Sequence, residues 1–374
     1  MLRNGLLLCC RINSFLQFFR GTAVQSWTKN ILPIFFAAAS LCLAQSRTFS
    51  ISGKISDLID GEPLINVNVF ISGSVWGTST DAKGYYLIKD IPIGNHQLVV
   101  SMIGYEPAQR SITVFDKKEV RLDFKMKEKI YEMGEVKVVG EIPDDWYDNL
   151  EIFKSYFLGK SDFADECTIE NETIINFTKN DDILSASAEK PLIIINKALG
   201  YKVTCYLLGF RFNSKADVCT YFSNSMFTEL TPENDEQKNE WMESREQAYK
   251  GSLKHFLISL IRKDYKKQGF SIYQLNGYYE TELRDISTIF RHDSSNHNVY
   301  HLRFDNELTV RYSPGFWKSS KYSVLRMLVD TVTLDESGEA EEVLPFQVKK
   351  YWGTKGIADN LPKDYYTGRL NSPK

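Results

Sequence analysis

The segment 49–127 constrains the fold of this chain more tightly than any other. Short runs of Val, Ile, Tyr and Phe alternate there with polar residues, and Gly, Asp, Asn or Pro interrupts the runs every several residues. Successive side chains of a strand point to opposite faces, so this alternation predicts half-buried strands joined by tight turns. The segment holds about seven such strands, which is typical of a small antiparallel β-sandwich.

Three turns separate the expected strands, at 60–63 (DGEP), 80–84 (TDAKG) and 91–94 (IPIG). In the second, the carboxylate of Asp81 can accept hydrogen bonds from backbone further along the turn, and Gly84 can adopt a left-handed conformation. A calcium or ligand role for Asp81 is the alternative. We favour the structural role because Asp is a common turn former in this pattern.

Four ordered motifs of this segment resemble a known family: GKISD, GEPLINVNVFISGS, WGTSTDAKGYYLIKDIPIG and LVVSMIGYEP. They resemble the carboxypeptidase-like regulatory domain, a transthyretin-like β-sandwich at the front of many Bacteroidetes envelope proteins, including TonB-dependent (SusC-like) receptors. One departure is Asn66, where the family usually has Gly, which implies a different local turn. The family is an accessory to metallocarboxypeptidases, so the resemblance does not imply peptidase activity.

The first 44 residues have the features of a leader. Lys29 precedes the apolar run ILPIFFAAASLCLA, and the polar QSR follows it, so a secretory signal peptide with cleavage after Ala44 is expected. Leu41 in front of Cys42 disfavours lipidation of that cysteine. Residues 1–26 add an apolar preamble that a signal peptide rarely needs, and we hypothesise that translation begins downstream of Met1.

Behind the sandwich domain (45–128) we expect a linker strand (129–142), an α+β domain (143–356) and an irregular tail (357–374). The motif EMGEVKVVG in the linker resembles the strand that joins this sandwich to the plug in TonB-dependent receptors. Three further pieces, FLGKSDFADECTIEN, EKPLIIINKALGY and WMESREQAYKGSLKHFLISL, resemble a region that recurs behind the same sandwich in Bacteroidetes envelope proteins. That resemblance implies no known activity.

Hydrophobic spacing outlines the α+β domain. Trp146, Leu150, Phe153 and Phe157 recur at helical spacing after Pro143, and core packing is the expected role of that stripe. A second helix is expected from Thr231, as N-cap, to Lys263. Strands are expected at 168–178, 184–188, 192–196, 201–212, 218–227, 299–304, 308–312, 322–330 and 343–351.

The search for catalytic or metal-binding motifs gives no site. A zinc carboxypeptidase would need a His-x-x-Glu pair, and none of the five histidines has Glu three residues on. His292, His297 and His301 form a cluster that could hold a metal if the segment folded back, but a solvated hairpin tip is the favoured interpretation. Ser187 and Lys190 match a Ser-x-x-Lys pattern without its companion motifs, so we attribute the match to chance. No catalytic, cofactor-binding or metal-binding residue is assigned.

Cysteine usage and charge exclude two classes of protein. Only Cys167, Cys205 and Cys219 follow the leader, so the chain is not a disulfide scaffold. Cys205 and Cys219 could bridge a hairpin, but free buried thiols are expected. The net charge of −3 argues against a nucleic-acid binder.

Together these features predict a mainly β, exported protein with a seven-stranded transthyretin- or Ig-like sandwich and an α+β C-terminal domain. We expect a non-enzymatic protein of the periplasm or outer-membrane surface. The sandwich would be an interaction or spacer module, and the C-terminal domain would bind an envelope protein or a polysaccharide, with membrane association through a partner. The alternatives are a small outer-membrane β-barrel, a TonB-dependent-receptor-associated protein, or a hydrolase whose site matches no motif.

Overall fold

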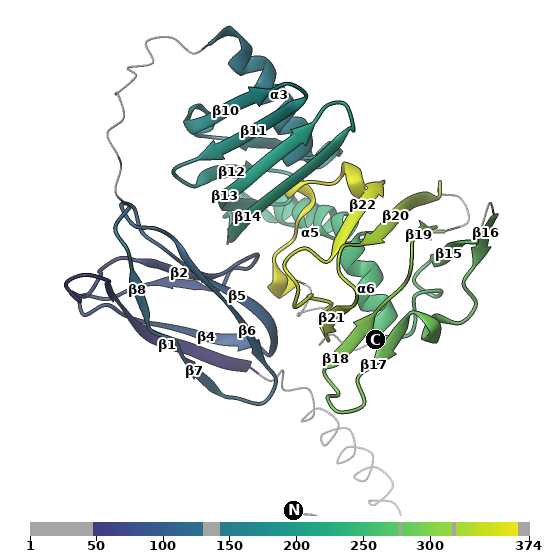
Figure 1. Ribbon diagram of the computed structural model, residues 1–374, viewed down its shortest axis with the longest axis horizontal. Helices are drawn as coiled ribbons and strands as arrows, with labels where there is room; N and C mark the ends of the chain where they lie inside the picture. Colours follow the sequence, from purple (N-terminus) through teal and green to yellow (C-terminus); the bar gives the residue numbers. More distant parts are fainter. Residues whose placement is uncertain (1–47, 130–142, 277–278, 316–318, 366–374) are drawn as a thin grey trace, which may run out of the picture. The chain divides into compact units, whose positions relative to one another are not determined.

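The computed structural model describes residues 48–129, 143–276, 279–315 and 319–365 (Figure 1). The predicted signal peptide and linker strand lie outside the described residues. The described part is mostly β, with a β domain first and an α+β region after it, as the sequence predicts.

The first domain is a β-sandwich, as expected (Figure 1). It is not antiparallel throughout, because β7 and β8 both pair parallel with β1. One sheet has the order β4-β1-β7, with β8 also paired to β1, and the other has the order β3-β2-β5-β6. Alternate residues of the strands, such as Phe49, Ile51 and Ile55 of β1, fill the core between the sheets. The strands are β1 (Thr48–Asp57), β2 (Asn68–Ile71), β3 (Gly77–Ser79), β4 (Tyr85–Pro92), β5 (Gly94–Ser101), β6 (Ala108–Val114), β7 (Glu119–Arg121) and β8 (Phe124–Met126).

The sandwich has eight strands where about seven were expected, and the chain between 119 and 126 forms two of them, β7 and β8. Between β7 and β8 the carboxylate of Asp123 accepts from the backbone N of Lys54 at 2.8 Å, in place of a ladder bond. The predicted turn at 80–84 is confirmed: Asp81 Oδ1 accepts from the N atoms of Lys83 (2.8 Å) and Tyr85 (2.9 Å). Asn66 has φ 60°, a left-handed conformation that Asn tolerates.

A six-stranded sheet follows, with the order β10-β11-β13-β12-β9 and with β14 paired to β13. Helix α3 (Asp144–Phe157) packs on it through Trp146, Leu150, Phe153 and Phe157, so the predicted stripe is a core face. The single strand expected at 168–178 is wrong, because a 3₁₀ turn (Glu172–Ile174) divides it into β9 and β10. The strands are β9 (Cys167–Ile169), β10 (Ile175–Asn180), β11 (Ile183–Ala188), β12 (Leu192–Asn196), β13 (Tyr201–Asn213) and β14 (Val218–Glu229), and a short helix α4 (Asp162–Asp165) precedes them.

The single helix expected from Thr231 to Lys263 is also wrong. The chain forms α5 (Asp235–Tyr249), capped by Asn234, and α6 (Leu253–Ile261), capped by Ser252. Gly251 separates them with φ +79°, and a Cβ there would lie 2.5 Å from the ring of Tyr312. The break therefore depends on a tertiary contact as well as on the glycine.

Two further sheets complete the C-terminal region. One has the order β16-β15-β19-β20-β22, and the other has the order β17-β18-β21. Helix α6 packs against them through Phe256, Leu257 and Leu260. The sequence interpretation proposed no strands for β15, β16, β17 or β21. The strands are β15 (Phe270–Asn276), β16 (Tyr279–Glu282), β17 (Phe290–His292), β18 (Val299–Leu302), β19 (Glu307–Tyr312), β20 (Lys321–Met327), β21 (Val332–Asp335) and β22 (Phe346–Lys350).

The described part of the predicted irregular tail has a packing role. After β22 the chain forms two 3₁₀ turns, Trp352–Thr354 and Ile357–Asp359. Ile357, Ala358 and Leu361 are buried in the core beneath the six-stranded sheet. The tail thereby brings Lys363 back toward the sandwich.

Candidate binding cleft

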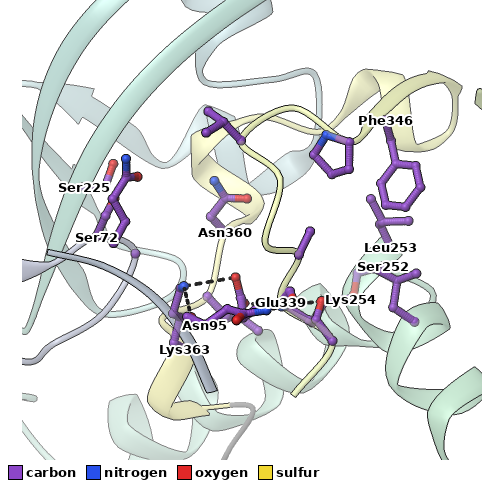
Figure 2. Close-up of a pocket in the computed structure, with 18 of the residues that line it drawn as sticks. Ser72, Asn95, Ser225, Ser252, Leu253, Lys254, Glu339, Phe346, Asn360 and Lys363 are labelled. Atoms are coloured by element: carbon purple, nitrogen blue, oxygen red, sulfur yellow. Dashed lines mark hydrogen bonds and ion pairs between the residues drawn. The ribbon is translucent and has the colours of Figure 1, made fainter. Parts of the chain in front are cut away.

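A cleft of about 600 Å³ lies where the sandwich meets the C-terminal region (Figure 2). Strands β5 and β6 of the sandwich, strand β14, the start of α6, the turn after β21 and the tail all contribute to its lining. These segments are far apart in the sequence, so only the tertiary fold assembles the cleft.

Three charged side chains form the polar centre of the cleft (Figure 2). Glu339 pairs with Lys254 on one side and with Lys363 on the other, where Nζ and Oε2 are 3.1 Å apart. Burial alone would raise the pKa of Glu339, but the two ammonium groups outweigh burial and hold the pKa well below its usual range. Glu339 is therefore a fixed negative charge between two positive ones.

A buried carboxylate joins the sandwich to the turn that carries Glu339. Asp335 is 2% exposed, and its Oδ2 accepts from the N of Asn95 at 2.7 Å. Burial raises the pKa of Asp335, and the charge of Glu339 raises it further. Gly94 has φ +137°, and a Cβ there would lie 2.4 Å from Asp335 Oδ2. Glycine is thus required for this close approach.

A second contact adds sandwich backbone to the six-stranded sheet. In the β2–β3 loop the N of Gly73 donates to Ser225 O at 2.6 Å, and the N of Phe227 donates to Ser74 O at 2.9 Å. Ser74 and Met226 form an isolated parallel bridge. The loop therefore pairs with the outer edge of β14 through a single β-bridge.

Aromatic packing supports the same contact. Phe70 of β2 is fully buried and stacks on Tyr206 of β13 with ring centroids 5.5 Å apart. Side chains alternate along β2, so Phe70 lies on the face opposite Val69 and Ile71, and the C-terminal region buries it through Tyr206.

His96 lines the cleft but is a poor acid–base group. Its Nε2 lies 2.6 Å from Pro92 O, so this nitrogen carries the proton of the neutral ring. Burial, and then the charge of Lys363, lower the pKa of His96 to about 4. Its Nδ1 is buried and has no hydrogen-bond partner among the described residues.

The thiols are not activated nucleophiles. Cys167, Cys205 and Cys219 are free, as expected. Burial raises the pKa of Cys167 and of Cys219 to about 12, and it raises that of Cys205 as well. In the β13–β14 pairing Cys205 lies opposite Ser225, and Cys219 lies opposite Phe212, so the hairpin does not bring the two thiols together.

The residues singled out from the sequence do not come together at the cleft. His292 ends β17, and its Nε2 contacts His297 O (2.8 Å), while His301 of β18 contacts Asp293 (2.9 Å). The segment is thus a hairpin connection, and the described residues contain no group of three or more potential metal ligands. Ser187 is exposed on β11, away from the cleft lining. The cleft residues carry no motif that a sequence search could have found.

The sheets and the cleft define a β-rich protein in which a β-sandwich contacts an α+β region. Residues 51–138 match the CarboxypepD_reg-like domain family model. The first domain is therefore a carboxypeptidase-regulatory-like domain, as its motifs predict. No curated protein matches the chain.

Several solved structures show a distant likeness. A 3-chlorocatechol 1,2-dioxygenase from Rhodococcus opacus is 12% identical over 23% of this chain and 61% of its own, with a TM-score of 0.19. A type II cohesin–X-dockerin complex from Acetivibrio cellulolyticus gives 20% identity over 30% of this chain and 78% of the other, with a TM-score of 0.20. A protein from Bacteroides uniformis, named as a candidate carbohydrate-binding protein, is 10% identical over 76% of this chain and 98% of its own, with a TM-score of 0.18. The chain thus spans about 61% of the dioxygenase.

Within the described residues, helices are too short or too polar to cross a membrane.

Proposed function

We propose that this chain is a non-enzymatic binding protein of the cell envelope, which is exported through its leader and holds a ligand in the cleft. The sandwich is a docking module that forms one wall of the site. The observation that carries this proposal is the chemistry of the lining: a mixed polar and aromatic cleft whose central carboxylate, Glu339, is already paired with the ammonium groups of Lys254 and Lys363.

Three further charged side chains of the lining also have partners within the protein. Lys355 pairs with Asp359 at 2.6 Å, and the Glu342 carboxylate accepts from the N of Thr333 at 3.0 Å. With the Glu339 group already paired, a ligand would meet chiefly neutral donors and aromatic rings. Such a lining favours retention of a ligand over acid–base or nucleophilic chemistry, which needs an activated group. The neutral polar and aromatic members are Ser72, Asn95, His96, Gln97, Ser111, Thr113, Ser223, Ser225, Ser252, Asn360, Tyr221, Phe227, Phe346, Tyr351 and Trp352.

The site can be tested by filling the cleft. Leu253 lines it and is half-buried, so Leu253→Trp would occupy the space that a ligand needs. Leu328→Trp is the matched control, because Leu328 is exposed and does not line the cleft. Immobilised natural protein and the control should retain the same envelope components from a detergent extract, and the Leu253→Trp protein should lose them. If all three proteins retain the same components, the cleft is not the binding site.

Catalysis is tested on the same proteins. Incubation of the natural chain with peptides, esters and oligosaccharides should leave all three unchanged. Turnover that Leu253→Trp abolishes would show that the cleft is an active site and would contradict the proposal.

A further inference from the structure

The outer edge of β14 is only partly paired. Ser225 O and Phe227 N point away from β13, because they bond the β2–β3 loop. The N–H and C=O groups of successive residues in a strand point alternately to its two edges. The pairing of β13 with β14 contains one register shift, but the extra residue lies in β13, between Leu207 and Gly209. The alternation along β14 is therefore uninterrupted. The backbone groups of Ser223 and Tyr221 therefore point to the same outer edge as those of Ser225.

These outward groups open onto the cleft. Tyr221 and Ser223 both line it. Among the described residues, no backbone group outside β13 forms a hydrogen bond with the backbone N–H or C=O of Tyr221 or Ser223. A row of unpaired backbone groups is a template for another strand. The Gly73–Ser74 segment already uses the next part of the same edge, at Ser225–Phe227.

We propose, resting on the binding function above, that the ligand is an extended peptide segment of another polypeptide, which adds as a strand to β14 at Tyr221 and Ser223. The added strand would continue, along the same edge, the pairing that the β2–β3 loop makes within the chain. Backbone hydrogen bonds would supply affinity, as in other cases of strand addition.

The two faces of β14 indicate the sequence that such a peptide would have. Tyr221 packs on Phe157 at the inner face, with ring centroids 5.1 Å apart, whereas Thr220 and Phe222 on the opposite face are exposed to solvent. Side chains of an added strand would alternate between these faces. The expected peptide therefore alternates apolar and polar residues. A glycan, in contrast, would depend on the side-chain hydroxyl groups of the lining rather than on the strand edge.

Proline separates these two modes of recognition. Ser223→Pro removes the outward N–H but no bond to β13, and proline is tolerated on edge strands where its nitrogen faces outward. Ser223→Ala keeps the N–H and removes only the hydroxyl. The probe is a phage-displayed library of random nonapeptides panned on each protein.

We expect the natural chain and Ser223→Ala to select alternating peptides, and Ser223→Pro to bind the selected peptides at least tenfold more weakly. Equal binding by Ser223→Pro, or loss of binding by Ser223→Ala, would overturn the proposal. So would a concentration-dependent dimer in sedimentation that Ser223→Pro dissolves, because the occupant would then be a second copy.

A second pair of variants guards against misfolding of the proline variant. Phe222 and Leu208 are exposed on adjacent strands, with 39% and 49% of their surface accessible. Phe222→Lys places a charge beside the edge and should weaken peptide binding, whereas Leu208→Lys on β13 should not. If the natural chain selects no peptide but still retains envelope components that Leu253→Trp loses, strand addition is wrong and the binding function stands.

Discussion

Asp335→Asn tests whether one buried carboxylate holds the sandwich to the C-terminal region. Asp335 Oδ1 accepts from the N and Oγ of Ser337 (2.9 and 2.7 Å) and from the N of Glu339 (3.0 Å). Its Oδ2 accepts from the N of Asn95 at 2.7 Å. An asparagine oxygen can replace Oδ1, but its amide group would then present a donor to the Asn95 N–H.

The magnitude follows from that single mismatch. Leaving a buried donor without a partner costs about 1–3 kcal/mol. The three bonds at Oδ1 also weaken, since charge-assisted hydrogen bonds are roughly twice as strong as neutral ones. Removing a buried charge offsets part of this loss. We therefore expect Asp335→Asn to lower the free energy of unfolding by about 2 kcal/mol.

Urea unfolding gives the stability, and hydrogen exchange locates the change. The amide of Asn95 should exchange faster in Asp335→Asn than in Ser337→Ala, a control that loses one hydroxyl bond but keeps the contact to the sandwich. If the unfolding free energy stays within about 0.5 kcal/mol of the natural value and the Asn95 amide keeps its protection, the docking argument is refuted.

Three further predictions concern acid stability and the helix break. His96 should stay neutral at pH 6 and protonate near pH 4 in NMR titrations, so the stability that its burial confers is lost as pH falls from 6.5 toward 4; a midpoint near 6.5 would contradict this. The lowered pKa of Glu339 contributes stability that is present above the ordinary pKa of 4.5 and lost in more acidic solution, so Glu339→Gln should flatten the acid dependence of urea unfolding and cost about 3 kcal/mol at pH 7; an unchanged profile would exclude that role. Gly251→Ala should cost about 2–4 kcal/mol through strain and the clash with Tyr312, against about 1 kcal/mol for Gly61→Ala, where the turn is open; equal losses in thermal unfolding would show that the ring contact contributes nothing.

The sandwich could be predicted from the sequence because its signals are local. Alternation along β1 fixes which residues face the core, and the Asp81 turn depends on bonds within a few residues. The helix stripe of α3 is equally local and was predicted correctly. Neighbouring residues contain the information for each of these elements.

Errors arose where a distant contact decides the local structure. An apolar stripe runs across 241–260 and favours one helix. The chain instead turns at Gly251, between α5 and α6, because the ring of Tyr312 packs against the backbone there. The domain limits, the leader and export stay predictions.

The amino-acid sequence by itself determined the sandwich and the helical core stripe of α3. It left open whether Cys205 and Cys219 pair, and the register of β13 and β14 decided that they do not. Only the tertiary structure decided the cleft, because its charges come from Lys254, Glu339 and Lys363 and its edge from β14. Hydrophobic periodicity reports which face of one element is buried. It carries no information about which distant elements meet, and the cleft exists only where they do.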